Sequence, residues 1–294
     1  MENNKKLLKA GIGLIAVWVV LGYIGVYLLY LEEPVFVEHY IEERIYTSQA
    51  DGPREVDLEL YYITNAGDQR VVNRVEFPEY PGIEVPASEY GMSGGLAMFS
   101  PEAQPPGDIK GRYSMRRVFL KFSLGEDYRE EEPLEITEAV IHFSDGSTLE
   151  TEIGSLHFQI DQDRGQVLES RGARGSGSLE RRTISVHQDI ELMGVESPLL
   201  GKVPEDLEIS INDVDYREIE GINIEAGEEL LVESNTQGSG PFHQDLRYWK
   251  IRPKLRFITD QGEEGQETLL VAWYPTRNCE FMDILRYLQQ KGAI

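Results

Sequence analysis

The pattern of apolar and polar positions divides the chain into one long uncharged segment and many short alternating ones. Residues 10–31 carry no charged side chain. About 20 apolar residues in a helix cross the hydrocarbon core of a bilayer, so this segment predicts a transmembrane helix. Lysines precede it and glutamates follow it, which places residues 1–9 in the cytoplasm and the rest of the chain outside.

A cleaved signal peptide is the alternative for the same segment. Signal peptides have an apolar run of about 7–15 residues, followed by small side chains at the cleavage site. Here the run is longer and ends in Tyr-Leu-Glu-Glu-Pro at residues 30–34, so bulky side chains stand where small ones are required. The pattern favours an uncleaved anchor and predicts the lipid bilayer as a partner of residues 10–31.

Beyond residue 38 the dominant pattern is the period of two that is typical of β-strands. Asp145-Gly146 separates two such runs, which is a strong hairpin signal. No alternation of strands with helices appears, and the spacing therefore predicts a mainly β fold with two tandem antiparallel sandwiches, at 38–160 and 161–276. The alternating segments are 56–63, 70–77, 113–124, 136–143, 148–153, 183–192, 207–211, 229–233, 249–259 and 267–274.

The last segment, 277–294, predicts a short helix. Asn278 is a favourable N-cap residue, and Gly292 stands where a helix end is expected. We expect this helix to pack on the second sandwich; a helix that binds a partner is the alternative. The apolar residues of its predicted buried face are Phe281, Ile284, Leu285 and Leu288.

A weak internal repeat supports two domains of similar size. Val-Glu-Phe-Pro at 75–78 resembles Val-Glu-Ser-Pro at 195–198. In the same order, Ile-His-Phe at 141–143, which precedes Asp145-Gly146, resembles Leu-Arg-Phe at 255–257. The offsets are about 115–120 residues, a usual length for a sandwich domain.

A glycine-rich stretch contains the sharpest catalytic motif. Gly-Met-Ser-Gly-Gly at 91–95 satisfies the Gly-x-Ser-x-Gly pattern of a hydrolase nucleophile elbow, with Ser93 as the nucleophile. Such an elbow needs a buried strand before the serine and a helix after it. Pro86 precedes the motif and Pro101 follows it closely, so a loop over 80–111 is the favoured interpretation, and a short strand near Ile83-Glu84-Val85 is the alternative for part of it.

Candidate metal ligands are sparse. His157 is followed by Asp161 and Asp163, a group that would need convergent partners to bind a metal. Asp213 and Asp215 form a second acidic turn, for which weak calcium binding is the alternative to a solvated loop. Neither group has the spacing of a known site, and no cofactor is predicted.

Composition narrows the class of protein. The formal net charge is −24, and the residues after 31 carry about −26, which disfavours nucleic acid as a partner. Cys279 is the single cysteine, so no intrachain disulfide forms. We expect a half-buried structural cysteine; the alternative is a thiol whose pKa is lowered at the helix N-terminus. The chain also lacks an Asn-x-Ser/Thr site, and these absences favour a bacterial envelope protein.

The strand that leads into Asn65-Ala66-Gly67 and the Phe143-Ser144-Asp145-Gly146 hairpin together resemble the immunoglobulin-like outer domains of membrane-anchored bacterial envelope proteins. The resemblance implies a fold rather than an activity. We expect a non-catalytic interaction, accessory or sensory module at the cell envelope, whose partner is another membrane or envelope protein. The alternatives are an anchored hydrolase that uses Ser93 or an acidic or metal site, and a passive structural surface protein.

Overall fold

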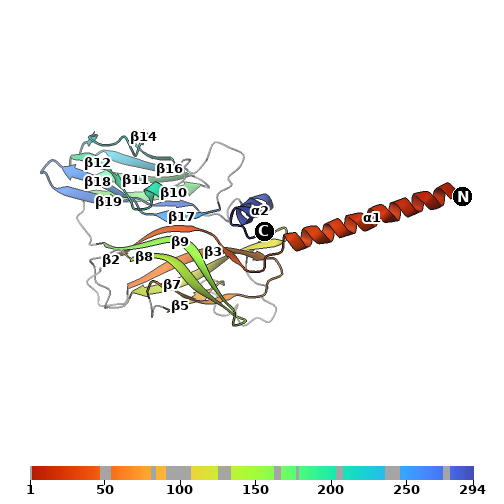
Figure 1. Cartoon of the computed structure of the whole chain (residues 1–294). Helices are drawn as coiled ribbons and strands as arrows, with labels where there is room; N and C mark the ends of the chain where they lie inside the picture. Colours follow the sequence, from red (N-terminus) through yellow and green to blue (C-terminus); the bar gives the residue numbers. More distant parts are fainter. Residues whose placement is uncertain are drawn as a thin grey trace.

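The computed structural model describes residues 2–46, 54–80, 84–90, 107–124, 134–161, 167–176, 179–202, 208–235, 246–273 and 279–294. Within them the protein is mainly β, with one helix near each end (Figure 1). Ser93 and Asp163, and the motif at 91–95, lie outside the described residues.

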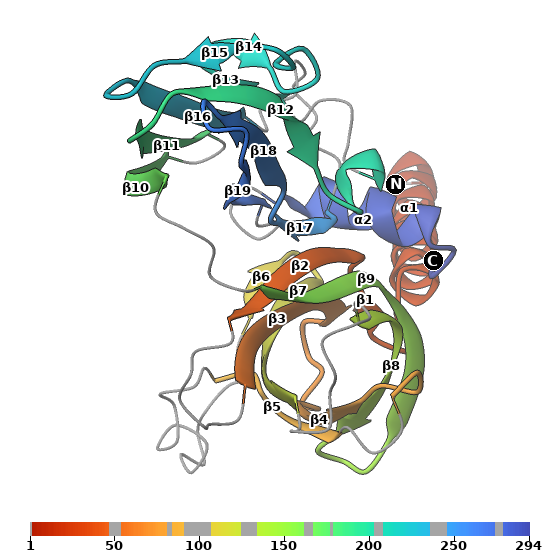
Figure 2. The ribbon, with the colours of Figure 1, turned by 90° about the vertical axis from the view of Figure 1, so that its left-hand side faces the viewer.

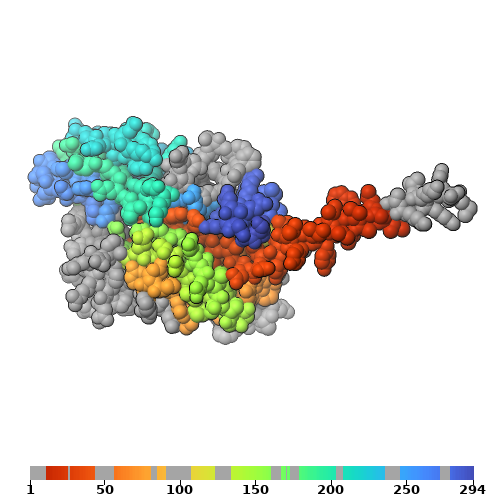
Figure 3. Space-filling model, viewed as in Figure 1, coloured from red at the N-terminus to blue at the C-terminus, as the bar shows by residue number. Residues whose placement is uncertain are grey.

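The N-terminal helix α1, Glu2–Leu28, projects away from the body of the protein (Figures 1 and 3). Within the part of the chain that the structure describes, no helix reaches the length and apolarity needed to cross a membrane. The helix differs from the predicted segment 10–31 at both ends, since it begins at Glu2. The helix ends at Leu28, and Leu31 is 2% exposed because it already packs in the protein core.

Strands of the first half form a single curled sheet, which Figure 2 shows nearly end-on. Its order is β1-β3-β7-β5-β4-β8-β9-β2, and β6 pairs with β7. The bounds are β1 Val35–Phe36, β2 His39–Tyr46, β3 Arg54–Asn65, β4 Val72–Glu76, β5 Glu84–Ser88, β6 Asp108–Lys110, β7 Tyr113–Leu124, β8 Leu134–Phe143 and β9 Thr148–Asp161.

The prediction of a two-layered sandwich for this half was wrong, because strand β5 connects the two layers. Its residues up to Pro86 pair with β4, whereas Ala87 and Ser88 pair with β7, so the two layers are joined into one half-barrel. Proline has no N–H to donate to a sheet ladder, and it suits the position where a strand changes partners. The inner face is filled by the apolar residues of the first core, among them Leu58, Phe122 and Phe158.

The second half contains two facing sheets around a core that includes Ile184, Leu230 and Phe257. One sheet has the order β10-β11-β16-β13-β14 and the other β15-β12-β18-β19. The bounds are β10 Leu168–Ser176, β11 Leu179–Val186, β12 Ile190–Glu196, β13 Glu208–Ile211, β14 Val214–Asp215, β15 Asn223–Ile224, β16 Glu229–Asn235, β18 Lys254–Thr259 and β19 Glu264–Thr268; a short 3-10 helix, η2, spans Leu200–Lys202.

Two strands from the second half of the chain extend the sheet of the first half. β17, Tyr248–Ile251, pairs in parallel with β2, and β20, Val271–Trp273, pairs with β17. The link between the two units is therefore a continuous sheet rather than a simple linker. Sequence periodicity identifies such strands but does not show which sheet they join.

The structure places the two parts of the internal repeat in equivalent strands. Val75 of β4 is the registered partner of Ile141 of β8, and Val195 of β12 is the registered partner of Leu255 of β18. Each first strand carries one irregularity in register just before the matched valine. The short sequence matches therefore correspond to one shared three-stranded unit, β4-β8-β9 in the first half and β12-β18-β19 in the second.

The hairpin turns of this repeated unit agree in detail. Gly146 N–H donates to Phe143 O at 3.0 Å, and Gly262 N–H donates to Thr259 O at 2.9 Å. Both glycines adopt positive φ, +85° and +80°. The hairpin predicted at Asp145-Gly146 is thus confirmed, and its repeat supplies a physical basis for the sequence similarity.

The C-terminal helix α2, Phe281–Gln290, packs on the first half of the protein. The expectation that it packs on the second sandwich was wrong. Its Ile284 and Leu288 enter a cluster with Leu31, Ile63 and Met115. The N-cap is Glu280, whose N–H donates to the Asp283 carboxylate at 2.9 Å; the predicted cap Asn278 lies outside the described residues. Periodicity predicted the apolar face correctly, but only the fold shows what it covers.

Candidate functional site

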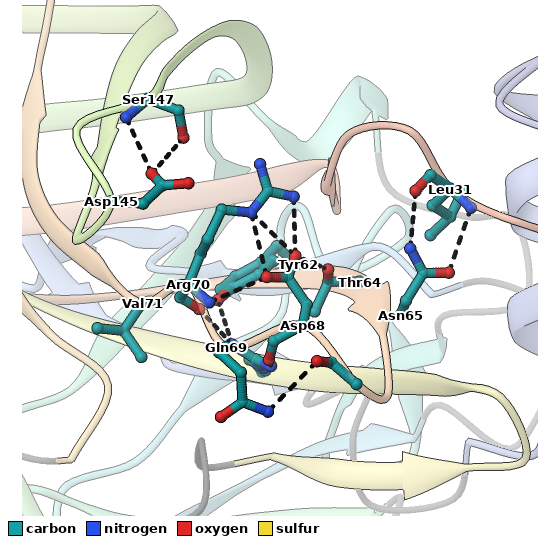
Figure 4. A network of polar contacts seen from close by, with 12 residues as sticks. Leu31, Tyr62, Thr64, Asn65, Asp68, Gln69, Arg70, Val71, Asp145 and Ser147 are labelled. Carbon is teal, nitrogen blue, oxygen red and sulfur yellow. Dashed lines mark hydrogen bonds and ion pairs between the residues drawn. The ribbon is translucent and has the colours of Figure 1, made fainter.

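The most specific polar arrangement lies where α1 joins the body of the protein. The Asn65 side chain holds the backbone of Leu31 by two hydrogen bonds (Figure 4): Leu31 N–H donates to Oδ1 at 3.2 Å, and Nδ2 donates to Leu31 O at 2.7 Å. Tyr113 Oη also donates to Leu29 O at 2.6 Å. We call Asn65, Tyr113 and the segment Leu29–Leu31 that they hold the α1 junction.

Helix α2 braces the other side of the α1 junction. Tyr287 Oη accepts a hydrogen bond from Glu38 N–H at 3.0 Å, and the Lys291 ammonium forms an ion pair with the Glu38 carboxylate. Burial acts to raise the pKa of Glu38, but the Lys291 ammonium and the Tyr40 hydroxyl outweigh it and lower the pKa. Helix α2 is thereby held against the segment that follows α1.

Replacing Asn65 by alanine is expected to loosen the α1 junction. Both hydrogen bonds to Leu31 disappear, and each contributes about 0.5–1.5 kcal/mol. Cleavage of the detergent-solubilised protein by a glutamate-specific protease at residues 32–33 should accelerate by about tenfold, since 1.4 kcal/mol corresponds to a factor of ten. Asn73→Ala, at an exposed position of β4, is the matched control and should leave the rate unchanged. Equal rates for the two variants would contradict a holding role for Asn65.

A buried ionic group lies beneath the α1 junction. Arg116 is 1% exposed and Glu89 is 5% exposed, and their charged atoms approach to 3.7 Å. Glu89 Oε1 accepts hydrogen bonds from Tyr62 Oη at 2.6 Å and from Val72 N–H at 2.7 Å. Burial raises the pKa of Glu89, which these donors oppose.

The guanidinium of Arg116 also fixes the turn that follows β3. It donates to the carbonyls of Asp68 and Arg70, the latter at 2.6 Å. In the same turn the Arg70 side chain pairs with Asp68 at 2.8 Å (Figure 4). Burial acts to raise the pKa of Asp68, but its bonds to Arg70 and Thr64 dominate and lower it to about 2. The turn therefore presents Asn65 to Leu31 in a fixed position.

A second polar cluster lies on the sheet face that meets the second unit. Ser155 Oγ lies 3.0 Å from His157 Nε2 and 2.9 Å from Glu135 Oε1. Glu135 Oε1 in turn lies 3.2 Å from His157 Nε2. Lys202 Nζ donates to Ser155 Oγ at 3.2 Å. In a serine hydrolase the acid orients the ring nitrogen opposite the one that faces serine. Here the Ser155 hydroxyl and the Glu135 carboxylate both face Nε2 of His157, so the arrangement does not support nucleophilic catalysis.

Two buried glutamates of β2 join the first unit to the second. Glu42 accepts hydrogen bonds from the Ser197 hydroxyl, from Leu199 N–H at 3.2 Å and from Arg252 N–H at 2.8 Å. Glu43 pairs with Lys250 and with Arg252, the latter at 3.0 Å. A cleft of about 360 Å³ lies beside them. Because these carboxylates are already partnered by backbone and basic groups, we interpret the cluster as a structural contact between the units.

His39 is a fully buried structural residue. Tyr61 N–H donates to its Nε2 at 2.7 Å, so its proton resides on Nδ1, which donates to Ile153 O at 3.1 Å. Burial lowers the pKa of His39 to about 3. It stays neutral in the folded protein throughout the pH range where a solvated histidine titrates.

This burial predicts a specific loss of stability in acid. Between pH 6.5 and about 3 the unfolded chain binds a proton at His39 that the folded protein does not. The contribution of His39 to the free energy of unfolding is therefore complete above pH 6.5 and is lost as the pH falls towards 3. The slope amounts to at most about 1.4 kcal/mol per pH unit. The free energy of unfolding, measured with urea at pH 4–8, should depend less steeply on pH in His39→Gln than in His187→Gln, which changes an exposed histidine and serves as the control. Equal slopes would contradict the assignment.

The predicted metal ligands do not assemble among the described residues, where no group of three or more potential ligands is found. His157 faces Glu135 as described, and burial lowers its pKa. Asp161 ends β9, and nothing is described of its side chain. Asp213 adopts positive φ in the β13–β14 turn, and Asp215 pairs with Arg217 at 3.3 Å.

Cys279 is buried, which agrees with the expected structural cysteine. The residue is 4% exposed, and burial raises the pKa of its thiol to about 12, so the alternative of a lowered pKa at the helix N-terminus is wrong. The sequence also did not point to Arg116 or Asn65 as organising residues. The available signal was the pair Arg116-Arg117 within an otherwise alternating strand, since one of two adjacent residues must face the core side.

Comparison with known proteins adds little to this geometry. No protein-family model matches the chain, and no curated protein matches it. Among solved structures, the crystal structure of the human Desmocollin-1 ectodomain gives a TM-score of 0.19 at 8% identity and covers 81% of this chain and 37% of that one. The chain thus spans well under half of that ectodomain, and a score this low supports no statement about activity or partner.

Proposed function

We propose that this protein is a non-catalytic accessory or interaction module, held at the outer face of a cell membrane by its N-terminal helix. The observation that carries the proposal is the exposure of apolar side chains all around α1. Trp18 is 68% exposed, Ile15 65% and Leu14 64%, and none of the elements that the structure describes covers them. A helix that is apolar on all sides requires an apolar environment, which lipid provides.

Lys5, Lys6 and Lys9 lie in the first turns of this helix, before its uncharged part, and support a cytoplasmic N-terminus and an outer location for the β units. The facing sheets of the second half are consistent with an immunoglobulin-like interaction domain. The polar clusters described above are engaged in holding the fold together. We therefore assign the function to the surface of an anchored body, and its partner to another membrane or envelope protein.

Fractionation of native membranes tests the anchor. We expect the full chain to remain in the pellet after extraction with alkaline carbonate, and the β units to be degraded when protease is added outside intact cells. Release by carbonate, or protection of the β units from external protease, would overturn the proposal. Crosslinking in the same membranes should recover a reproducible membrane or envelope protein; recovery of this chain alone would contradict the interaction role.

A further inference from the structure

Few large apolar side chains are exposed on the body of the protein. Beyond α1, those among the described residues are Tyr30, Ile109, Met193 and Met282. Three of these four lie beside the α1 junction. Their concentration at one end requires an explanation, because single exposed apolar residues are otherwise scattered over protein surfaces.

The contacts around Tyr113 place Ile109 and Met282 at this end. β6 pairs with the start of β7 through Lys110 and Tyr113, and Tyr113 bonds to Leu29. The ring of Phe281, the residue before Met282, stacks on Tyr113 at 5.9 Å between centroids. Both exposed side chains therefore flank the point where α1 leaves the body, and Figures 1 and 3 show α2 beside that point.

We infer that Ile109 and Met282 form a lipid-contacting rim that seats the outer body on the bilayer surface in one orientation. Ile109 is 62% exposed and Met282 is 50% exposed, which is the arrangement of side chains that dip into the interfacial region. This inference rests on the proposed membrane anchor.

The end of α1 and nearby charge support a bilayer as the occupant. The exposed apolar side chains of α1 continue to Leu28, the last residue of the helix, so the proposed anchor ends directly before the α1 junction. Lys110 and Arg112 follow Ile109, and segment 107–124 holds five basic residues against one acidic residue, Asp108, although the whole chain carries a net charge of −24. Cations next to apolar side chains suit lipid headgroups, which carry phosphate.

The α1 junction makes a fixed orientation physically possible. A flexible linker would let the body rotate freely above the membrane, but Asn65 and Tyr113 hold Leu29–Leu31 against the core. Leu31 itself packs in the same cluster as α2. Rim and helix therefore reach the bilayer as one rigid surface.

Depth-dependent quenching tests the rim. Single-cysteine variants of the full chain in a Cys279→Ser background carry an environment-sensitive fluorophore at Ile15→Cys, Ile109→Cys, Met282→Cys or Met193→Cys. They are reconstituted in neutral phosphatidylcholine vesicles with or without lipids that bear a nitroxide near the headgroup or at the mid-acyl chain. We expect about twofold or greater quenching by the shallow nitroxide at 109 and 282, and none at the distant control 193.

The probe at 15 separates the two possible failures. Quenching at 15 by the mid-acyl nitroxide, with 109 and 282 no more quenched than 193, would overturn the rim while the anchor stands. Absence of quenching at 15 would overturn the anchor and the rim together. Quenching at 109 and 282 that is lost in Asn65→Ala would further show that the α1 junction fixes the orientation.

Discussion

Replacing Arg116 by methionine is expected to lower the free energy of unfolding by about 3–5 kcal/mol, because it leaves the Glu89 carboxylate buried without its countercharge. Arg116 is 1% exposed, and its guanidinium also donates to two backbone carbonyls of the turn after β3. Methionine fills a similar volume but donates nothing. Urea unfolding of the full chain in detergent, followed by tryptophan fluorescence, measures the loss.

A variant that removes the charge of Glu89, the partner of Arg116, serves as the control. In Glu89→Gln an amide oxygen can still accept from Tyr62 and Val72, and Arg116 keeps its bonds to the carbonyls of Asp68 and Arg70, so we expect a smaller loss of about 1–3 kcal/mol. The double variant Arg116→Met/Glu89→Gln should be more stable than Arg116→Met alone, since the unpaired charge is gone. A loss below 1 kcal/mol for Arg116→Met would show that water reaches the pair.

Replacing Gly154 by alanine is expected to destabilise the protein by about 3 kcal/mol or more. Gly154 has φ +105°, a conformation that costs a residue with a side chain about 1–3 kcal/mol. A Cβ at this position would also overlap the backbone of His39, its registered partner in β2, and stand 2.5 Å from the nitrogen. Relieving that overlap in a tightly packed region costs about a further 1–3 kcal/mol.

Gly146→Ala is the matched control for this strain. Gly146 also has positive φ, +85°, but a Cβ there meets no atom within 4 Å. Its loss should be about 1 kcal/mol, from conformation alone. Thermal unfolding of both variants separates the two contributions, and equal losses would show that β2 and β9 move apart without resistance. Because β2 also carries β17, Gly154→Ala should in addition weaken the link between the two units.

Particular elements show how far periodicity reaches. The alternation in 136–143 and 148–153, together with Asp145-Gly146, predicted the β8–β9 hairpin correctly, since a two-residue period and turn chemistry are local properties. Which strands pair with one another, in contrast, depends on contacts between residues far apart in the chain. A short strand near Ile83-Glu84-Val85 was the alternative to a loop, but only the fold shows that β5 joins both layers.

The site residues divide in a similar way. Ser93 stays a sequence prediction, since it lies outside the described residues. Asn65 was recognised only as a turn residue, because its bonding partner Leu31 is remote in the sequence and was assigned to the apolar segment. The pair Arg116-Arg117 indicates that one arginine faces the core side, but not what pairs with it, because the partner Glu89 is distant in the sequence.

The sequence by itself determined a long apolar helix, a mainly β body, an internal repeat and a short amphipathic C-terminal helix. These follow from periodicity, charge and turn residues, which act over a few positions. Only the tertiary structure decided that the first half curls into a half-barrel, that β17 extends it, and that α2 packs beside α1. Those outcomes depend on contacts between residues far apart in the chain, such as Asn65 with Leu31 and Glu38 with Lys291, whose energies no local pattern encodes.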